Sequence, residues 1–313
     1  MPPTRLPAPV ALGGAVAIGA MTAIQARVNG VLGFRIDDGI VAGLVSFAVG
    51  LVILVVVTVA LPTTRAGAAR LWRGVRTRQV PVWMLCGGAC GALTVSTQGL
   101  TAGLLGVSLF SVGVVAGQTV NGLLLDRLGV GPAGVVAVTP GRVLGGAFAL
   151  AAVAISLSGD ALTRAPWWLL VLPFAAGVGI AWQSAANGRL AQRVGSPMTA
   201  TLMSFIGGTA VLIVASAVSI AVRGMPEDLP SEPWLYLGGL LGFAYILLGA
   251  TIVAHTGVLL MGLGAVLGQL VASIIIDLVW PAAAGPALWQ LIAMIVVSVA
   301  SVAVALPWRR RRR

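Results

Sequence analysis

The sequence predicts an all-α membrane protein with ten transmembrane helices, and three observations lead to this prediction. Of the 313 residues, 58% are hydrophobic and only 9% are charged, whereas soluble proteins carry about 25% charged residues. The apolar residues form long continuous runs, and a helix needs about 20 of them to cross about 30 Å of hydrocarbon. These runs lack the alternation of transmembrane β-strands, and the 42 glycines suit helices that pack closely in lipid.

Charged residues and prolines divide the chain into ten apolar runs, each long enough for one helix. The runs are 8–28, 39–61, 81–100, 103–125, 132–157, 166–187, 197–222, 233–253, 256–278 and 286–307. The first run imitates a cleavable signal peptide. An internal counterpart at 166–187, described below, indicates instead that it is retained. The arginine-rich segment between the second and third runs is expected to be a basic loop.

The arginines gather in every second connection between the predicted helices. One side of the membrane receives Arg5, Arg65, Arg70, Arg73, Arg76, Arg78, Arg127, Arg189, Arg193 and Arg309 to Arg313. Because basic residues favour short cytoplasmic connections, we expect both termini in the cytoplasm. The net charge of +11 also raises nucleic-acid binding as an alternative. Arginines that flank predicted spans fit anionic lipid headgroups better, so membrane lipid is an expected partner and nucleic acid is not.

The two halves of the chain repeat each other. A shift of 158 positions aligns the first two helices with the sixth and seventh, and a shift of 151 positions aligns the later ones. Matched pairs include Gln25 with Gln183, Asn29 with Asn187, Ser46 with Ser204, Gln118 with Gln269 and Asp126 with Asp277. Five helices per repeat is an odd number, so the second repeat should enter the membrane upside down. We therefore expect two five-helix domains, residues 1–158 and 159–313.

The repeated motifs resemble those of a known transporter group. "QARVNGVL" and "LVSFAVG" in the first half, with "QSAANGRL" and "LMSFIGG" in the second, resemble the drug/metabolite transporter (DMT) superfamily. The resemblance is greatest to its YdcZ-like branch of bacterial inner-membrane proteins, and it covers essentially the whole chain as a fused double repeat. It implies an EamA-like fold of two inverted halves, a central pathway and export of a small molecule. It also implies that the fifth and tenth helices are peripheral elements, which either support the bundle or form a homodimer.

Uncharged polar side chains are expected to line that pathway in two layers. The outer layer holds Gln25, Asn29, Ser46 and Gln269, and the inner layer holds Gln183, Asn187, Ser204 and Gln118, with Asn121 nearby and Trp182 next to Gln183. An amide that faces lipid loses hydrogen bonds worth several kcal/mol, so these groups should face the interior. We interpret them as substrate-binding or gating residues. The alternative is structural, because amides also cap helix ends and join neighbouring helices.

The sequence therefore predicts a transporter that exports a small polar or amphipathic metabolite or drug by alternating access. Two alternatives stay open: a flippase for a lipid-linked headgroup, and a non-transporting membrane assembly subunit. An enzyme is not expected, because a single histidine, no lysine and eight acids offer little for acid–base or nucleophilic catalysis. Cys86 and Cys90 have no histidine or acid near them in sequence, so we expect no metal and no cofactor.

Overall fold

The computed structural model describes residues 7–156, 171–226, 228–280 and 288–305, and these residues form helices and connections without any strand. Five of the described helices are long and apolar enough to cross a membrane. They are Pro9–Arg35, Gly39–Ala60, Pro197–Arg223, Pro233–Thr256 and Val258–Val279. The all-α membrane class is thus confirmed.

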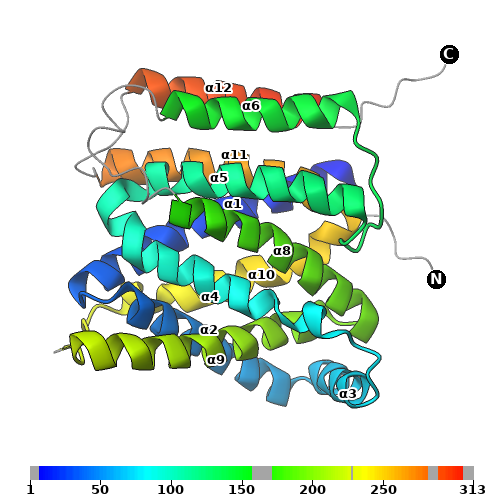
Figure 1. Cartoon of the computed structure of the whole chain (residues 1–313), viewed down its shortest axis with the longest axis vertical. Coiled ribbons are helices and arrows are strands. Elements are labelled where there is room, and N and C mark those ends of the chain that lie inside the picture. The colour runs from blue at the N-terminus through cyan, green and yellow to red at the C-terminus, as the bar shows by residue number, and fades with distance from the viewer. Residues whose placement is uncertain (1–6, 157–170, 227, 281–287, 306–313) are drawn as a thin grey trace.

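The described helices follow the same order in each half (Figure 1). The first half contains α1 (Ala8–Arg35), α2 (Gly39–Ala60), α3 (Pro62–Arg76), α4 (Gly87–Thr97), α5 (Gly103–Leu128) and α6 (Pro140–Ser156). The second half contains α8 (Val171–Val194), α9 (Pro197–Arg223), α10 (Leu237–Thr256), α11 (Val258–Val279) and α12 (Leu288–Ala305). Short 3₁₀ turns, Val82–Leu85 and Pro233–Tyr236, precede α4 and α10, and the π-helix η2 (Gln98–Ala102) joins α4 to α5.

The described residues contain eleven α-helices rather than ten, because the basic segment expected as a loop is the helix α3. Pro62 occupies its first turn, where a missing N–H costs nothing. Its small residues Thr64, Gly67 and Gly74 are buried while its arginines are exposed. At 15 residues α3 is too short to cross the bilayer. Its composition suits a helix that lies at the membrane surface.

Several expected helix boundaries also differ. The first and sixth helices extend beyond their expected ends at 28 and 187, to Arg35 and Val194. The predicted break near residue 101 is absent, since the chain stays helical through η2. The predicted fifth helix begins at Pro140 and not at 132, because Gly129 ends α5 with a φ of 67° and the chain to Pro140 is irregular. The expected starts of the sixth and tenth helices, at 166 and 286, lie outside the described residues.

The helices of the two halves interleave. α1 packs against α11 and α10, and its repeat equivalent α8 packs against α5 and α4. α2 contacts α9, while α6 and α12 lie side by side at one edge, beyond α5 and α11 (Figure 1). The core of the molecule is therefore the interface between the repeats.

Two aspartates that match each other in the two repeats connect α5 with α11. Near the end of α5, Asp126 accepts hydrogen bonds from the backbone N–H groups of Val258 and Leu259, at 2.8 and 3.0 Å, where α11 begins. Near the end of α11, Asp277 accepts one from the backbone N–H of Ser108, at 3.1 Å, in the second turn of α5. Helix amides without an acceptor are costly in lipid. These reciprocal bonds require equivalent helices α5 and α11 to run antiparallel.

A pair of stacked rings marks the contact between α2 and α9. Phe47 and its repeat equivalent Phe205 have ring centroids 4.8 Å apart. Each ring covers a glycine of the opposite helix, since a Cβ at Gly50 would meet Phe205 and a Cβ at Gly208 would meet Phe47. Contact between equivalent residues is what a two-fold relation between the halves would produce.

Glycines let the backbones of α1 and α11 touch. A Cβ at Gly268 of α11 would overlap the carbonyl group of Val16, and a Cβ at Gly19 of α1 would overlap that of Ala265. The equivalent glycines Gly117 and Gly177 make the same contact between α5 and α8. In lipid such close contacts supply much of the packing energy between helices.

We expect Gly268→Ala to lower the free energy of unfolding by about 1–3 kcal/mol, because the added methyl group forces α1 and α11 apart. Unfolding of the purified protein in mixed micelles, followed by circular dichroism, measures this change. The matched control is Gly262→Ala on the same helix, whose added Cβ would meet nothing within 4 Å. Equal stability of the two variants would contradict the close contact.

Candidate substrate site between the repeats

The first amide cluster consists of Gln25, Asn29, Ser46 and Gln98, all buried. Gln25 and Asn29 are four residues apart on α1 and so lie on one face of that helix. The Gln25 amide nitrogen donates a hydrogen bond of 2.8 Å to the carbonyl of Gly238. The oxygens of Asn29 and Ser46 also lie where a Cβ of Gly238 would be, so the cluster requires glycine there.

The side chain of Gln98 completes this cluster. Asn29 Nδ2 donates to Gln98 Oε1 at 2.7 Å, and Gln98 Nε2 donates to Gln25 Oε1 at 3.2 Å. Gln98 is the first residue of the π-helix η2 and is fully buried. π-Helical turns within α-helices are frequent at functional sites. One carboxamide thus fills the space between two others.

The second amide cluster consists of Gln183, Asn187, Ser204 and Gln118, also all buried. Gln183 and Asn187 share a face of α8, and the Ser204 hydroxyl donates to Asn187 Oδ1 at 2.8 Å. The position equivalent to Gln98 is Gly249, which has no side chain to offer. A cavity of about 30 Å³ lies here instead, enough for about two water molecules.

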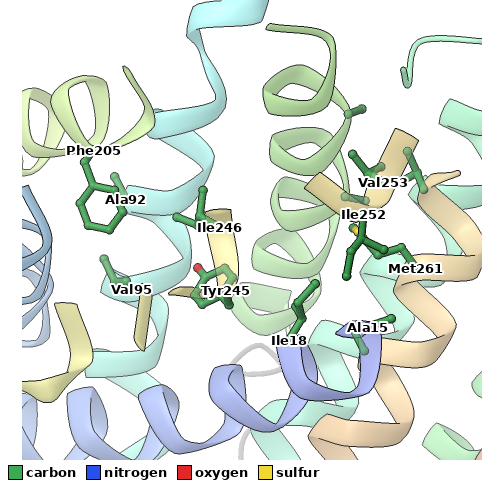
Figure 2. Close-up of a cluster of buried hydrophobic side chains, with 14 of the residues drawn as sticks. Ala15, Ile18, Ala92, Val95, Phe205, Tyr245, Ile246, Ile252, Val253 and Met261 are labelled. Carbon is green, nitrogen blue, oxygen red and sulfur yellow. The ribbon is translucent and has the colours of Figure 1, made fainter. Parts of the chain in front are cut away.

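Polar atoms without partners line this cavity. Among the described residues, Gln183 Nε2, Gln118 Oε1 and the Tyr245 hydroxyl are buried and make no hydrogen bond. Figure 2 shows the Tyr245 side chain next to Ile246 and near Ile18, both of which also line the cavity. An unpaired buried polar group costs about 1–3 kcal/mol. Three such groups around one cavity are typical of a site built for a ligand.

The remaining predicted residues lie elsewhere. Gln269 is fully buried with both amide atoms unpaired, and it does not line this cavity. Asn121 donates a hydrogen bond of 2.8 Å to the carbonyl of Val178, which joins α5 to α8 as a structural contact. Trp182 lies edge-to-face with Trp83 at 6.0 Å and lines a surface groove instead.

Two grooves occupy equivalent places at opposite ends of the bundle. The groove of about 880 Å³ is lined by Trp83, Trp182, Gly129 and Arg189, among others. The other, of about 350 Å³, is lined by Trp234, Ile24, Trp280 and Arg27 among others. Trp280 takes the position equivalent to Gly129, and the Arg27 guanidinium lies 5.2 Å from its ring centroid. One end is therefore filled by a large ring that the other end lacks.

Charged groups stand apart from the amide clusters. Arg142 forms an ion pair with Asp126. In the connection before α10, the hydrogen bond from Arg35 lowers the pKa of Glu232 below its ordinary value. No three His, Cys, Asp or Glu side chains come together within the described residues as a metal site would need. The cavity offers neutral hydrogen-bonding groups, without a nucleophile and base placed for reaction.

Two polar residues were not predicted from the sequence: Gln98 of the first amide cluster and Tyr245 of the cavity. Most of the predicted residues are identical in both repeats, whereas Gln98 matches Gly249 and Tyr245 matches Thr94. The pattern that would have identified these two residues is a large polar residue in one repeat aligned with a smaller residue in the other.

We expect Gln98→Leu to lower the free energy of unfolding by about 1–3 kcal/mol, because it leaves Gln25 Oε1 and Asn29 Nδ2 without partners. Gln118→Leu is the matched control, a buried glutamine of the same size whose carbonyl oxygen is already unpaired. It should cost less than about 1 kcal/mol. Thermal unfolding in detergent compares the two variants. A larger loss for Gln118→Leu would contradict the hydrogen bonding of the first cluster.

Comparison with known proteins identifies a family. A family profile of the DMT class, described as "Putative inner membrane exporter, YdcZ", matches the chain twice, over residues 10–155 and 160–303. A solved structure described only as "Crystal structure of protein" is similar in fold, with a TM-score of 0.63 and 18% identity over 96% of this chain and 98% of that chain. A search of curated proteins found no match.

Proposed function

Because the chain belongs to the YdcZ family of inner-membrane exporters within the DMT superfamily, as a fused double repeat, we propose that it exports a small polar or amphipathic metabolite through the cavity between the repeats. The observation that most supports this proposal is the cavity lined by the unpartnered atoms Gln118 Oε1, Gln183 Nε2 and the Tyr245 hydroxyl. Its uncharged lining favours a neutral molecule, a zwitterion or a planar base over a polyanion. The family also supports a role other than catalysis.

The proposed topology has ten spans, formed by all the described α-helices except α3, with the second repeat inverted. The 11-residue α4 forms its span together with the 3₁₀ turn Val82–Leu85 before it and η2 after it. The antiparallel arrangement of α5 and α11 supports the inversion. α6 and α12 also run antiparallel, since Ser301 Oγ donates to the Gly145 carbonyl at 2.7 Å and Gln290 Nε2 donates to the Ile155 carbonyl at 3.2 Å. The arginine distribution favours cytoplasmic termini. The Arg309 to Arg313 tail and the proposed domain boundary at 158 lie outside the described residues.

The proposed mechanism is alternating access between two equivalent clusters. Near the outer end, the side chains of Gln98 and Trp280 fill space between the helices. At the equivalent positions near the inner end, Gly249 and Gly129 have no side chain, and the space is open. With cytoplasmic termini, the open cavity lies in the cytoplasmic half, where an exporter collects its substrate. Exchange of the two arrangements would carry the substrate to the other face.

The alternatives make different demands on the cavity. A flippase needs a lateral opening to lipid, whereas every residue that lines this cavity is buried or half-buried. This supports a water-soluble substrate over a lipid-linked one. An assembly subunit would have no use for unpartnered polar groups inside the bundle. A homodimer through α6 and α12 stays a proposal; their outward residues, such as Phe148 and Ile292, are exposed.

We expect Gln183→Leu to reduce transport by at least about tenfold, because it replaces a hydrogen-bonding group of the cavity with an apolar one of similar size. Uptake and efflux of a metabolite panel by the purified protein in liposomes, with and without a proton gradient, measure this effect.

The matched control for that assay is Gln79→Leu, which changes an exposed glutamine in the connection after α3. It should transport as well as the wild type. Full transport by Gln183→Leu, or no transport of any compound by the wild type, would overturn the proposed role.

A further inference from the structure

The difference between the two amide clusters identifies the chemical group that the cavity accepts. We propose that the cavity binds a planar carboxamide-like group, whose C=O accepts from Asn187 Nδ2 and whose N–H donates to Gln183 Oε1. Primary amides, ureas and the lactam edge of a pyrimidine base carry this pair of atoms. The inference rests on the proposed function, since it names the substrate class of the same site.

The first step is the equivalence of the clusters. Gln25 Nε2 lies 2.6 Å from the place of a Cβ at Gly242, and Gln183 Nε2 lies 2.6 Å from that of a Cβ at Gly91, its repeat equivalent. The oxygens of Asn29 and Ser46 surround Gly238 in the same way that the oxygens of Asn187 and Ser204 surround Gly87. The α1 and α8 amides are therefore placed alike toward the helix opposite, with the difference that Gln25 Nε2 donates to the Gly238 carbonyl and Gln183 Nε2 has no partner.

The second step is the occupant of the first cluster. Gln98 places a carboxamide between Asn29 and Gln25, with its oxygen accepting from one and its nitrogen donating to the other. This carboxamide belongs to a side chain, but its hydrogen bonds are those that a free amide would make. The Gln98 side chain thus shows that a carboxamide fits between a glutamine and an asparagine placed in this way.

The third step is the space in the second cluster. A Cβ at Gly249 would meet only Ile18 Cδ1, at 3.9 Å, which is ordinary contact. The cavity of about 30 Å³ has room for about two water molecules, so as it stands it takes only the amide end of a ligand. The rest of the ligand requires the side chains of Ile18, Tyr245 and Met261, which line the same cavity, to move apart.

Charge selects among planar groups. The cavity lining contains no Asp, Glu, Lys or Arg, so an ionised carboxylate would lose its water without gaining a counter-ion. A carboxylate also has no donor for Gln183 Oε1. A neutral amide satisfies both partners.

The probe for the test is nicotinamide, a planar primary amide, with nicotinate and N,N-dimethylnicotinamide as matched compounds. Binding to the full-length protein in lipid nanodiscs is measured by calorimetry and by the shift in melting temperature. We expect nicotinamide to bind at least about tenfold more tightly than either control, because each control lacks one required property. Equal binding of the three, or no binding of nicotinamide, overturns the proposal.

Variants at Gly249 test the position directly. Gly249→Gln supplies the second cluster with its own amide and should abolish nicotinamide binding while the melting temperature stays at or above that of the wild type. Gly249→Ala is the matched control and should still bind. If Gly249→Gln fails to fold, Asn187→Leu replaces it and should weaken binding at least about tenfold. Undiminished binding by whichever of these two variants is used overturns the proposal.

The experiments can reject the carboxamide site and the export function independently of each other. Amide-selective binding without any transport in liposomes would support the carboxamide site and reject export. Transport of other compounds without amide binding would reject the carboxamide site and leave export standing.

Discussion

The structure depends on one constraint: inside a bilayer, each amide or backbone N–H must find its hydrogen-bond partner within the protein. In the first amide cluster Gln98 bonds to both Gln25 and Asn29, and the reciprocal bonds of Asp126 and Asp277 provide acceptors for backbone N–H groups of α11 and α5. The second cluster does not meet this constraint. The unpaired atoms of Gln118, Gln183 and Tyr245 surround a cavity, whereas those of Gln269, Asn29 and Ser46 do not.

The repeat explains why the two halves can differ so usefully. Equivalent helices carry the same amides, glycines and aromatic rings. A glycine in one repeat at the position of a large residue in the other therefore leaves a space that the large residue fills in its own repeat. Gly249 opposite Gln98 and Gly129 opposite Trp280 both open the same end of the molecule. In the proposed inverted arrangement, differences at these few positions would set which end of the protein is open.

The sequence predicted much of this arrangement because lipid leaves few choices. Apolar runs located the helices, and the repeated amides pointed to the clusters that the structure brings together around Asn29 and Asn187. The helix α3 was expected as a loop because its arginines interrupt any continuous apolar run, although its apolar and charged residues do separate onto two faces. The sequence could not reveal that Asp126 and Asp277 reach across to the other repeat, because such contacts depend on how the halves interleave. Gln98 was missed because a search for repeated residues passes over residues that differ.

The stacked pair Phe47 and Phe205 has a consequence for motion. In the proposed mechanism the two repeats exchange conformations. Phe47 and Phe205 are equivalent residues, so the exchange would swap their places and leave the contact between the two rings unchanged. Contacts far from it, such as those of the grooves, must change the most. The two halves would therefore rotate relative to each other about the contact between these two rings.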